Sequence, residues 1–123
     1  MLGNELRIGN YVKFCSEYYK VIEIQKDCFY AENKDKDQFK NNTTQLDPIP
    51  LNESIISTLC GELNKWLGDY RLQVTDDYSM SFSLDNDMIY VGDLIELRIS
   101  ETPVHRLQNL YLVLSGKELT LNL

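Results

Sequence analysis

The stretch from Thr102 to Gly116 reads as a helix whose two ends are both marked in the sequence. Thr102 is a preferred N-cap residue, Pro103 suits the first helical turn, and Gly116 can end the helix in a left-handed conformation. Apolar residues recur along it at helical spacing, which predicts one buried stripe. The stripe consists of Val104, Leu107, Leu110, Tyr111 and Leu114. Any fold of this chain must provide an apolar surface for that stripe.

The size and composition of the chain predict one globular domain. It has 123 residues, of which 43% are hydrophobic, enough to bury a core without disulfides or metal ions. We expect a single domain over residues 1–123, and Pro48–Pro50 is where it would divide into subdomains 1–47 and 48–123. No apolar run approaches the roughly 20 residues of a membrane-spanning helix, and Met1–Glu5 lacks the features of a signal peptide. We therefore expect a cytoplasmic protein without membrane association.

The N-terminal third is rich in β-branched and aromatic residues, which favours strands. A meander that curls into a small barrel-like sheet is predicted from three segments: Leu6–Phe14 with a turn or bulge at Gly9–Asn10, Tyr18–Ile24, and Cys28–Glu32 after a turn at Lys26–Asp27. The stretch Asn33–Thr44 is the most polar of the chain, and we interpret it as a solvated loop.

A second helix and a second meander follow. Asn52 is a good N-cap for a helix from Glu53 to about Cys60, with Leu51 packing onto Ile56 across the cap and Gly61 as a stop before Leu63–Leu67. From Asp69 the hydrophobic period changes to two, which predicts a four-stranded antiparallel meander. Its strands are Tyr70–Val74, Ser79–Leu84, Met88–Val91 and Leu94–Ile99, with turns at Asp76–Asp77, Asp85–Asp87 and Gly92–Asp93. Glu118–Leu123 could add an edge strand. The predicted class is α+β, two antiparallel meanders packed with two main helices.

Signatures of catalysis or metal binding are missing from the sequence. The single histidine, His105, lies in the first turn of the last predicted helix, where we expect a packing or surface role. The three cysteines match neither a disulfide framework nor a zinc knuckle. The Asp85–Asp87 run begins like a calcium loop, but Tyr90 stands where that loop needs glycine. We therefore expect no enzymatic activity, no cofactor and no metal.

Negative charge is concentrated in one part of the chain. The net charge is −7, and residues 69–101 hold eight acidic residues against Arg71 and Arg98. Such a segment disfavours direct binding to DNA, which requires neutralised phosphates, and suits a basic protein surface. Acidic surfaces also serve solubility, and that interpretation stays open. The partner-binding residues predicted in this way are Asp69, Asp76, Asp77, Asp85, Asp87, Asp93 and Glu96, with the neighbouring Tyr78.

Tyrosines and lysines alternate along the predicted N-terminal strands. Aromatic and basic side chains on a small sheet can stack nucleic-acid bases. Tyrosine also packs well on sheets and is enriched at protein interfaces, so three interpretations remain open. The residues concerned are Tyr11, Tyr18, Tyr19 and Tyr30 with Lys13, Lys20 and Lys26.

Three sequence blocks occur in order along the chain: Asn4–Asn10 (NELRIGN), Pro48–Glu53 (PIPLNE) and Val104–Tyr111 (VHRLQNLY). They resemble a family of small uncharacterised proteins of bacterial phages and mobile elements, in which LRIGN, PIPLTE and HQLQNLY recur. The chain departs from that pattern with Asn52 in place of threonine and Arg106 in place of glutamine, and both changes are conservative for the fold. The resemblance implies a phage-like context in a host cell without implying a reaction.

These observations lead to two principal hypotheses of function. The first is a non-enzymatic acidic binding protein of phage or prophage type, similar in profile to anti-CRISPR proteins, which inhibits a basic nucleic-acid-handling nuclease such as a host CRISPR-type nuclease. The alternative is a nucleic-acid-associated accessory protein that uses the N-terminal β-sheet, with Tyr18 and Lys20 in contact with the nucleic acid. A small hydrolase without a recognisable motif is a third interpretation. The oligomeric state is left open by the sequence.

Overall fold

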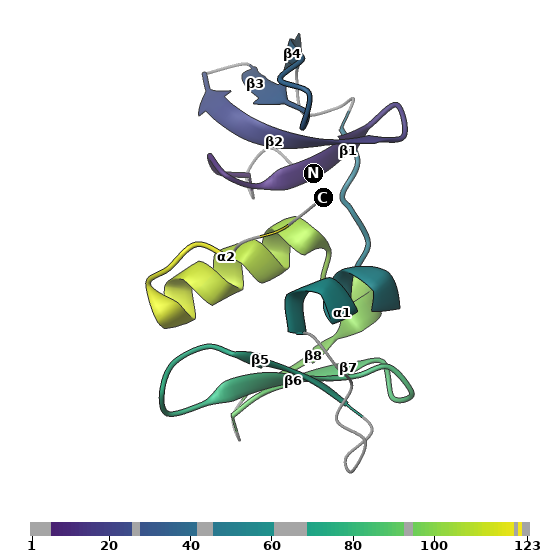
Figure 1. The fold of residues 1–123 in the computed structure, drawn as a ribbon, viewed down its shortest axis with the longest axis vertical. Helices are drawn as coiled ribbons and strands as arrows, with labels where there is room; N and C mark the ends of the chain where they lie inside the picture. Colours follow the sequence, from purple (N-terminus) through teal and green to yellow (C-terminus); the bar gives the residue numbers. More distant parts are fainter. Residues whose placement is uncertain are drawn as a thin grey trace.

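Two antiparallel meanders lie at opposite ends of an elongated molecule, with the helices between them (Figure 1). The computed structural model describes residues 6–25, 28–41, 46–60, 69–92, 95–119 and 121. The layer between the sheets holds α1 (Glu53–Cys60) and α2 (Val104–Ser115). The predicted α+β class, with two meanders and two main helices, is confirmed.

The N-terminal sheet has the strand order β1-β2-β3-β4. Its strands are β1 (Tyr11–Phe14), β2 (Glu17–Ile24), β3 (Phe29–Glu32) and β4 (Gln38–Asn41). The register between β2 and β3 is interrupted between Val21 and Glu23, an irregularity of the kind that bends a strand. Alternate side chains form a small core of their own, made of Val12, Tyr19, Val21, Phe29, Ala31 and Leu46. Asp47, which follows β4 in the chain, pairs with Lys13 of β1 through two backbone hydrogen bonds of 2.9 Å. The sheet therefore curls as predicted, but its described strands do not form a closed barrel.

The predicted solvated loop contains the fourth strand of this sheet. The side-chain oxygen of Asn33 accepts hydrogen bonds from the backbone N–H groups of Asp35 (3.0 Å) and Asp37 (2.9 Å), which folds residues 33–37 into a turn. The chain then returns as β4 and pairs with β3. Polar residues are tolerated there because β4 is the last strand of the order. Residues 42–44 of the predicted loop, and the predicted turn at Lys26–Asp27, lie outside the described residues.

The C-terminal sheet has the strand order β5-β6-β7-β8 and follows the predicted alternation closely. Its strands are β5 (Tyr70–Gln73), β6 (Ser79–Ser83), β7 (Met88–Val91) and β8 (Ile95–Arg98). One face is buried against the helices and includes Tyr70, Met80, Phe82, Ile89 and Val91. Strict apolar–polar alternation decides the register here, since a one-residue slip would turn every apolar side chain to solvent.

Helix α1 begins as predicted. The Asn52 side-chain oxygen accepts a hydrogen bond from the backbone N–H of Ile55 at 2.9 Å, as an N-cap does. Ile55 and Ile56 bury the apolar face of the helix. The predicted stop at Gly61 and the apolar stretch Leu63–Leu67 lie outside the described residues.

The two ends of α2 differ in how well the sequence predicted them. Gly116 ends the helix with φ of 73°, and its N–H donates to the carbonyl of Leu112, as predicted. Thr102 is not the N-cap, so that prediction is wrong. Its hydroxyl donates instead to the carbonyl of Arg98 (2.8 Å), across the short 3-10 helix η3 (Ile99–Glu101). The first N–H of α2, that of Val104, donates to the carbonyl of Ile49 at 2.8 Å.

The buried stripe of α2 is confirmed. Val104 and Leu107 are fully enclosed in the main core, and Leu110, Tyr111 and Leu114 pack against it. The predicted edge strand at the C-terminus is wrong for the described residues, because Leu119 and Leu121 are buried in this core without belonging to a strand. His105 is also buried, which is the packing role expected for it.

A polar network joins the N-terminal sheet to α2. The side-chain oxygen of Gln108 accepts a hydrogen bond from the backbone N–H of Tyr11 (2.8 Å), and its amide nitrogen donates to the carbonyl of Gly9 (2.9 Å). The amide of Asn10 donates to the side-chain oxygen of Asn109 at 2.9 Å. Asn10 and Gln108 are almost completely buried. Buried amides with several partners of this kind fix the relative position of two elements.

Arg7 extends this network to the surface. Its guanidinium donates to the backbone carbonyl of Gln108 (3.2 Å) and forms an ion pair with Glu118. The backbone N–H of Arg7 donates to the side-chain oxygen of Asn10 at 2.8 Å. The segments Leu6–Asn10 and Leu107–Asn109 therefore meet in space as a structural joint.

Candidate functional site

The outward face of the N-terminal sheet carries tyrosines and lysines in neighbouring positions. Val12, Tyr19 and Val21 point into the small core, so the residues between them point the other way. Tyr11 lies opposite Lys20 across β1 and β2, and Lys13 lies opposite Tyr18. Of the predicted set, Tyr11, Tyr18, Tyr30, Lys13 and Lys20 share this face, on which Tyr11 also packs against the main core. Tyr19 points into the small core, and Lys26 lies outside the described residues.

Two adjoining hollows open where the β1–β2 turn and the β3–β4 turn lie at the same end of this sheet. Their volumes are about 240 Å³ and about 150 Å³, and both are lined by Tyr18, Asn33 and Lys34. The larger, outer hollow is completed by Ser16, Glu17 and Asp35. The smaller, inner hollow is completed by Tyr11, Lys20, Glu32 and Lys36. We call the two together the tyrosine–lysine cleft.

The inner hollow carries an excess of positive charge. Lys20, Lys34 and Lys36 face one carboxylate there, that of Glu32, and the Lys36 ammonium pairs with it at 3.4 Å. Lys20 and Lys34 are exposed. The outer hollow has the opposite balance, because Glu17 and Asp35 face Lys34. An anion would therefore be held in the inner hollow and repelled from the outer one.

The tyrosines of the cleft differ in exposure. Burial raises the pKa of Tyr11, and the nearby Lys36 lowers it by a smaller amount. Tyr18 is 38% exposed to solvent. Further along the same sheet face, the Lys40 ammonium lies 6.0 Å from the ring centroid of Tyr30. An exposed aromatic ring beside ammonium groups can stack a planar base while the lysines hold a phosphate.

The turn that borders the outer hollow is tight. Cys15 and Ser16 form a two-residue hairpin loop between Phe14 and Glu17, and both have positive φ, of 49° and 67°. Two-residue loops with this backbone match the twist of the strands and are usually built from asparagine and glycine. In this turn, two residues other than glycine adopt the left-handed backbone conformation next to Tyr18.

The acidic residues of 69–101 are divided between distant parts of the C-terminal sheet. Asp76 and Asp77 are exposed in the β5–β6 turn, next to the half-buried Tyr78. Asp85 and Asp87 lie in the β6–β7 turn at the opposite end of the strands (Figure 1). The five residues of β6 that separate the two turns span about 17 Å.

Several acidic side chains of this half form ion pairs or hydrogen bonds within the fold or lie on another surface. Asp69 lies 3.6 Å from the guanidinium of Arg71. Asp87 accepts hydrogen bonds from the backbone N–H (3.0 Å) and the hydroxyl (2.6 Å) of Ser100. Glu96 is exposed on the outer face of β8, and Asp93 lies outside the described residues. The structure therefore brings together Asp76 and Asp77 with Tyr78, and does not gather the full set into one field.

The outer face of the C-terminal sheet is not acidic either. Across the four strands, Arg71, Ser81, Tyr90 and Glu96 form one row. Ser83, Met88 and Arg98 form the next row. Among the described carboxylates of residues 69–101, that of Glu96 alone lies on a strand, and its row also carries Arg71.

Two findings bear on metal binding and on cysteine reactivity in the part of the chain that the structure describes. No cluster of three or more His, Cys, Asp or Glu side chains is placed there to hold a metal ion. Burial raises the pKa of the Cys60 thiol to about 12, so this sulfur stays protonated and is a poor nucleophile at neutral pH. Among the described helices, none is both long and apolar enough to cross a membrane.

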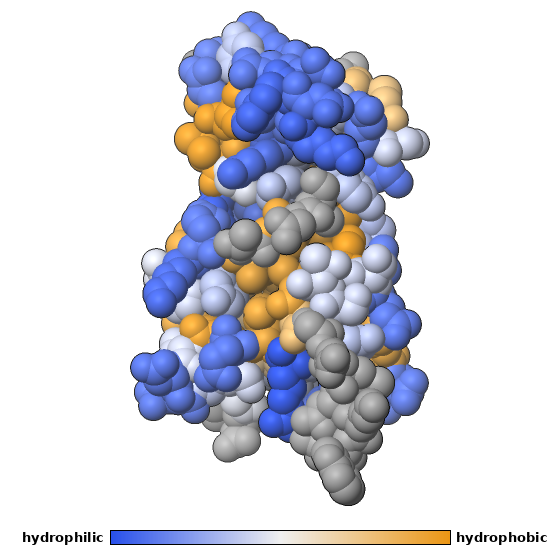
Figure 2. Space-filling model, in the orientation of Figure 1, coloured by the Kyte–Doolittle hydropathy of each residue, from blue (hydrophilic) through white to orange (hydrophobic). Residues whose placement is uncertain are grey.

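Comparison of the chain with protein-family models, with curated proteins and with solved structures gives no match. The functional argument therefore rests on the surface of the molecule. Figure 2 shows that hydrophilic residues cover most of the N-terminal sheet on this face, while hydrophobic ones gather in the middle, over the layer of the helices.

Proposed function

We propose that this protein is a non-enzymatic, nucleic-acid-associated accessory protein that binds single-stranded nucleic acid in its tyrosine–lysine cleft. The observation that carries the proposal is the inner hollow, where Lys20 and Lys34 lie beside the exposed ring of Tyr18. A phosphate would sit between the lysines, and the adjacent base would stack on Tyr18. The phage-like resemblance fits such a role, since phage proteins commonly act on nucleic acids or on the proteins that handle them.

The negative net charge does not oppose this proposal, because the charge is distributed unevenly between the two sheets. The acidic residues of 69–101 belong to the C-terminal sheet, at the other end of the long axis from the cleft (Figure 1). Charges separated by more than a Debye length of about 8 Å are largely screened at physiological salt. Few lysines contribute, so binding would be weak and its salt dependence shallow, with a slope of about −2 in log K against log salt.

Fluorescence anisotropy with a labelled single-stranded oligonucleotide tests the proposal. We expect Lys20→Glu and Lys34→Glu each to weaken binding roughly tenfold, and Tyr18→Ala to cost ~1–3 kcal/mol of binding free energy through lost stacking. Lys117→Glu, an exposed lysine beyond α2, makes the same change in net charge and controls for it. Tyr90→Ala is the matched control for the aromatic ring, because Tyr90 is 36% exposed on the other sheet.

A folded protein that does not bind single-stranded DNA or RNA at low salt would contradict the proposal. A loss of binding in Lys117→Glu as large as that in Lys20→Glu would also count against it. The second outcome would mean that the oligonucleotide responds to total charge and not to the cleft.

A second candidate function, an anti-CRISPR-like inhibitor of a basic nuclease, is supported by the exposed pair Asp76 and Asp77. The Asp77 N–H donates to the hydroxyl of Thr75 (3.2 Å), which fixes the turn that presents both carboxylates. Pull-down from host lysate at increasing salt tests this candidate, with Asp76→Lys/Asp77→Lys expected to abolish capture of a nuclease. Asp35→Lys, an exposed acid on the other sheet, is the control.

A further inference from the structure

The strand β8 is the last of its sheet, and its backbone is regular over Ile95–Arg98. In the described part of the chain it pairs with β7 on one side. Its sequence, Ile-Glu-Leu-Arg, contains no proline, glycine or bulge, while its short length and two charged side chains disfavour pairing with a strand that does not match their charges. This feature lies in the other sheet from the tyrosine–lysine cleft and is independent of the function proposed above.

The ladder fixes which backbone groups of β8 face outward. The N–H of Ile99 donates to the carbonyl of Asp87 at 3.1 Å, so Ile99 belongs to a hydrogen-bonded pair. Such pairs alternate along an antiparallel ladder, which makes Leu97 and Ile95 bond to β7 as well. Glu96 and Arg98 therefore direct their backbone N–H and carbonyl groups away from β7. The carbonyl of Arg98 accepts from the Thr102 hydroxyl and keeps a second lone pair.

The side chains of β8 are self-complementary in charge. Glu96 and Arg98 are both exposed and lie on the same face of the strand, two residues apart, with Leu97 between them on the opposite face. When a second β8 is laid antiparallel with the two Leu97 residues facing each other, each Glu96 stands opposite the other copy's Arg98. These pairs are of the hydrogen-bonded type, so backbone parity and side-chain charge agree on one register.

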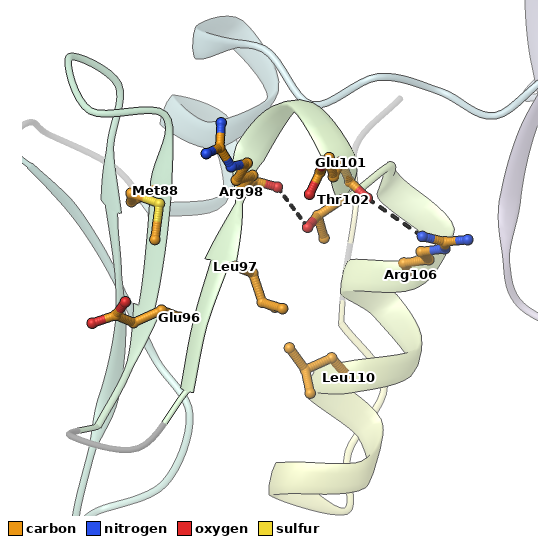
Figure 3. A pocket seen from close by; sticks show the side chains of 8 residues that line it. All are labelled: Met88, Glu96, Leu97, Arg98, Glu101, Thr102, Arg106 and Leu110. Atoms are coloured by element: carbon orange, nitrogen blue, oxygen red, sulfur yellow. Dashed lines mark hydrogen bonds between the residues drawn. The ribbon is translucent and has the colours of Figure 1, made fainter.

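A hollow lies along the same edge. It has a volume of about 590 Å³ and is lined by residues of β7, β8, η3 and α2, among which Met88, Leu97 and Leu110 are apolar. Figure 3 shows Leu97 and Leu110 pointing toward each other across it, with Arg106 and Glu101 near its upper end. Leu97 and Leu110 are only half-buried in the chain by itself. In the register given above, the second copy's Leu97 would enter this space and cover both.

We propose that β8 is a self-association edge, and that two copies of this chain pair antiparallel through it about Leu97 to form one continuous sheet. The contact is isologous, because the same residues serve both copies. Only a short strand takes part, so the dimer is weak and depends on protein concentration.

Analytical ultracentrifugation over a concentration series, from low micromolar to millimolar, tests this pairing. We expect the wild-type chain to dimerise, and Glu96→Arg or Arg98→Glu alone to raise the dimer dissociation constant roughly tenfold or more, because like charges then face each other. The double variant Glu96→Arg/Arg98→Glu restores complementarity and should dimerise again. Mixing the two single variants should give a heterodimer. Arg71→Glu, on the outer face of β5, is the control and should leave the dimer unchanged.

Cross-linking gives a second readout that does not depend on charge. Facing residues in a non-hydrogen-bonded pair have Cα atoms about 4.5 Å apart, within the span of a disulfide. We expect Leu97→Cys, in a Cys15→Ser/Cys28→Ser background, to form a disulfide-linked dimer under mild oxidation. Ser81→Cys, in the middle of the sheet, should not.

A wild-type chain that stays monomeric at millimolar concentration overturns the proposal. So does a dimer that forms without cross-linking at position 97, since it would use another surface. A double variant that folds normally by circular dichroism but fails to regain the dimer would exclude the proposed register.

Discussion

The two sheets share one topology, a four-stranded antiparallel meander, yet they stabilise the molecule in different ways. The C-terminal sheet presents a continuous apolar face to both helices and forms the main core with them. The N-terminal sheet bends around a small core of its own, which includes Val21 and Phe29. The difference shows that the strand order alone does not decide where a sheet's apolar face goes. Both helices cover the apolar face of the C-terminal sheet, whereas the N-terminal sheet contacts α2 mainly through β1.

The joints with α2 differ in the same way. The C-terminal sheet meets α2 through apolar side chains such as Phe82 and Leu107. The N-terminal sheet meets it through the buried amides of Asn10 and Gln108. An apolar joint tolerates small shifts, whereas a polar one has a single satisfied arrangement. Tyr11 packs against the main core beside this joint, whereas Tyr18 and Lys20 stay exposed, and the candidate cleft lies around them.

Truncation of one phenylalanine in each sheet gives the largest expected contrast. Phe82 and Phe29 are both buried, but Phe82 lies in the core shared with the helices. We expect Phe82→Ala to lower the free energy of unfolding of the whole molecule by ~3–5 kcal/mol. Phe29→Ala should open mainly the N-terminal sheet. Native-state hydrogen exchange should then show faster exchange in β1–β3 with protection kept in β6 and α2.

The control for this comparison is an exposed aromatic residue. Tyr90→Ala, on the outer face of the C-terminal sheet, should change the free energy of unfolding by no more than about 0.5 kcal/mol. If Phe29→Ala lowered the protection of α2 as much as Phe82→Ala does, the two sheets would unfold as one unit and the contrast drawn here would be wrong.

Removal of the Gln108 side chain tests the polar joint directly. Gln108→Ala leaves the backbone N–H of Tyr11 and the carbonyl of Gly9 without their side-chain partner in a buried place. We expect a loss of ~1–3 kcal/mol in the free energy of unfolding, measured by urea denaturation. Gln38→Ala, an exposed amide on β4, should have almost no effect. Equal effects of the two variants would show that the buried amide does not hold the sheet to the helix.

The features that the sequence predicted correctly are those set by local rules. Asn52 caps α1 because its side chain reaches an N–H three residues ahead, and Gly116 ends α2 because it adopts positive φ without strain. The strands of the C-terminal sheet were predictable because their alternation is strict. The same rules failed at the start of α2, where the local sequence predicted Thr102 as the N-cap. There the first helical N–H, that of Val104, donates to the carbonyl of Ile49, a residue far away in the sequence.

The candidate site shows the same limit. The pairing of Tyr18 with Lys13 follows from the two-residue turn, and the sequence already placed tyrosines and lysines on these strands. The hollow itself depends on the 33–37 turn, which is held beside Tyr18 because β4 pairs with β3. The sequence did not predict β4, because the residues of this stretch are mostly polar. The division of the acidic residues follows from the meander, because successive turns lie at opposite ends of the strands. The role of Gln108 could not be read from its position in a helix, since its partners lie about a hundred residues away.

The smallest expected effect concerns the polar contacts between the C-terminal sheet and α2. The Tyr78 hydroxyl donates to the carbonyl of Leu114, and the Tyr111 hydroxyl donates to that of Gln73, both at 3.4 Å. These bonds are long and lie at the edge of an apolar joint, so Tyr78→Phe and Tyr111→Phe should each cost less than about 1 kcal/mol in urea denaturation. Gln108→Ala, measured beside them, should cost more than either. If Tyr78→Phe proved as costly as Gln108→Ala, polar contacts would hold both sheets to α2, and the apolar core would not be what distinguishes the C-terminal joint.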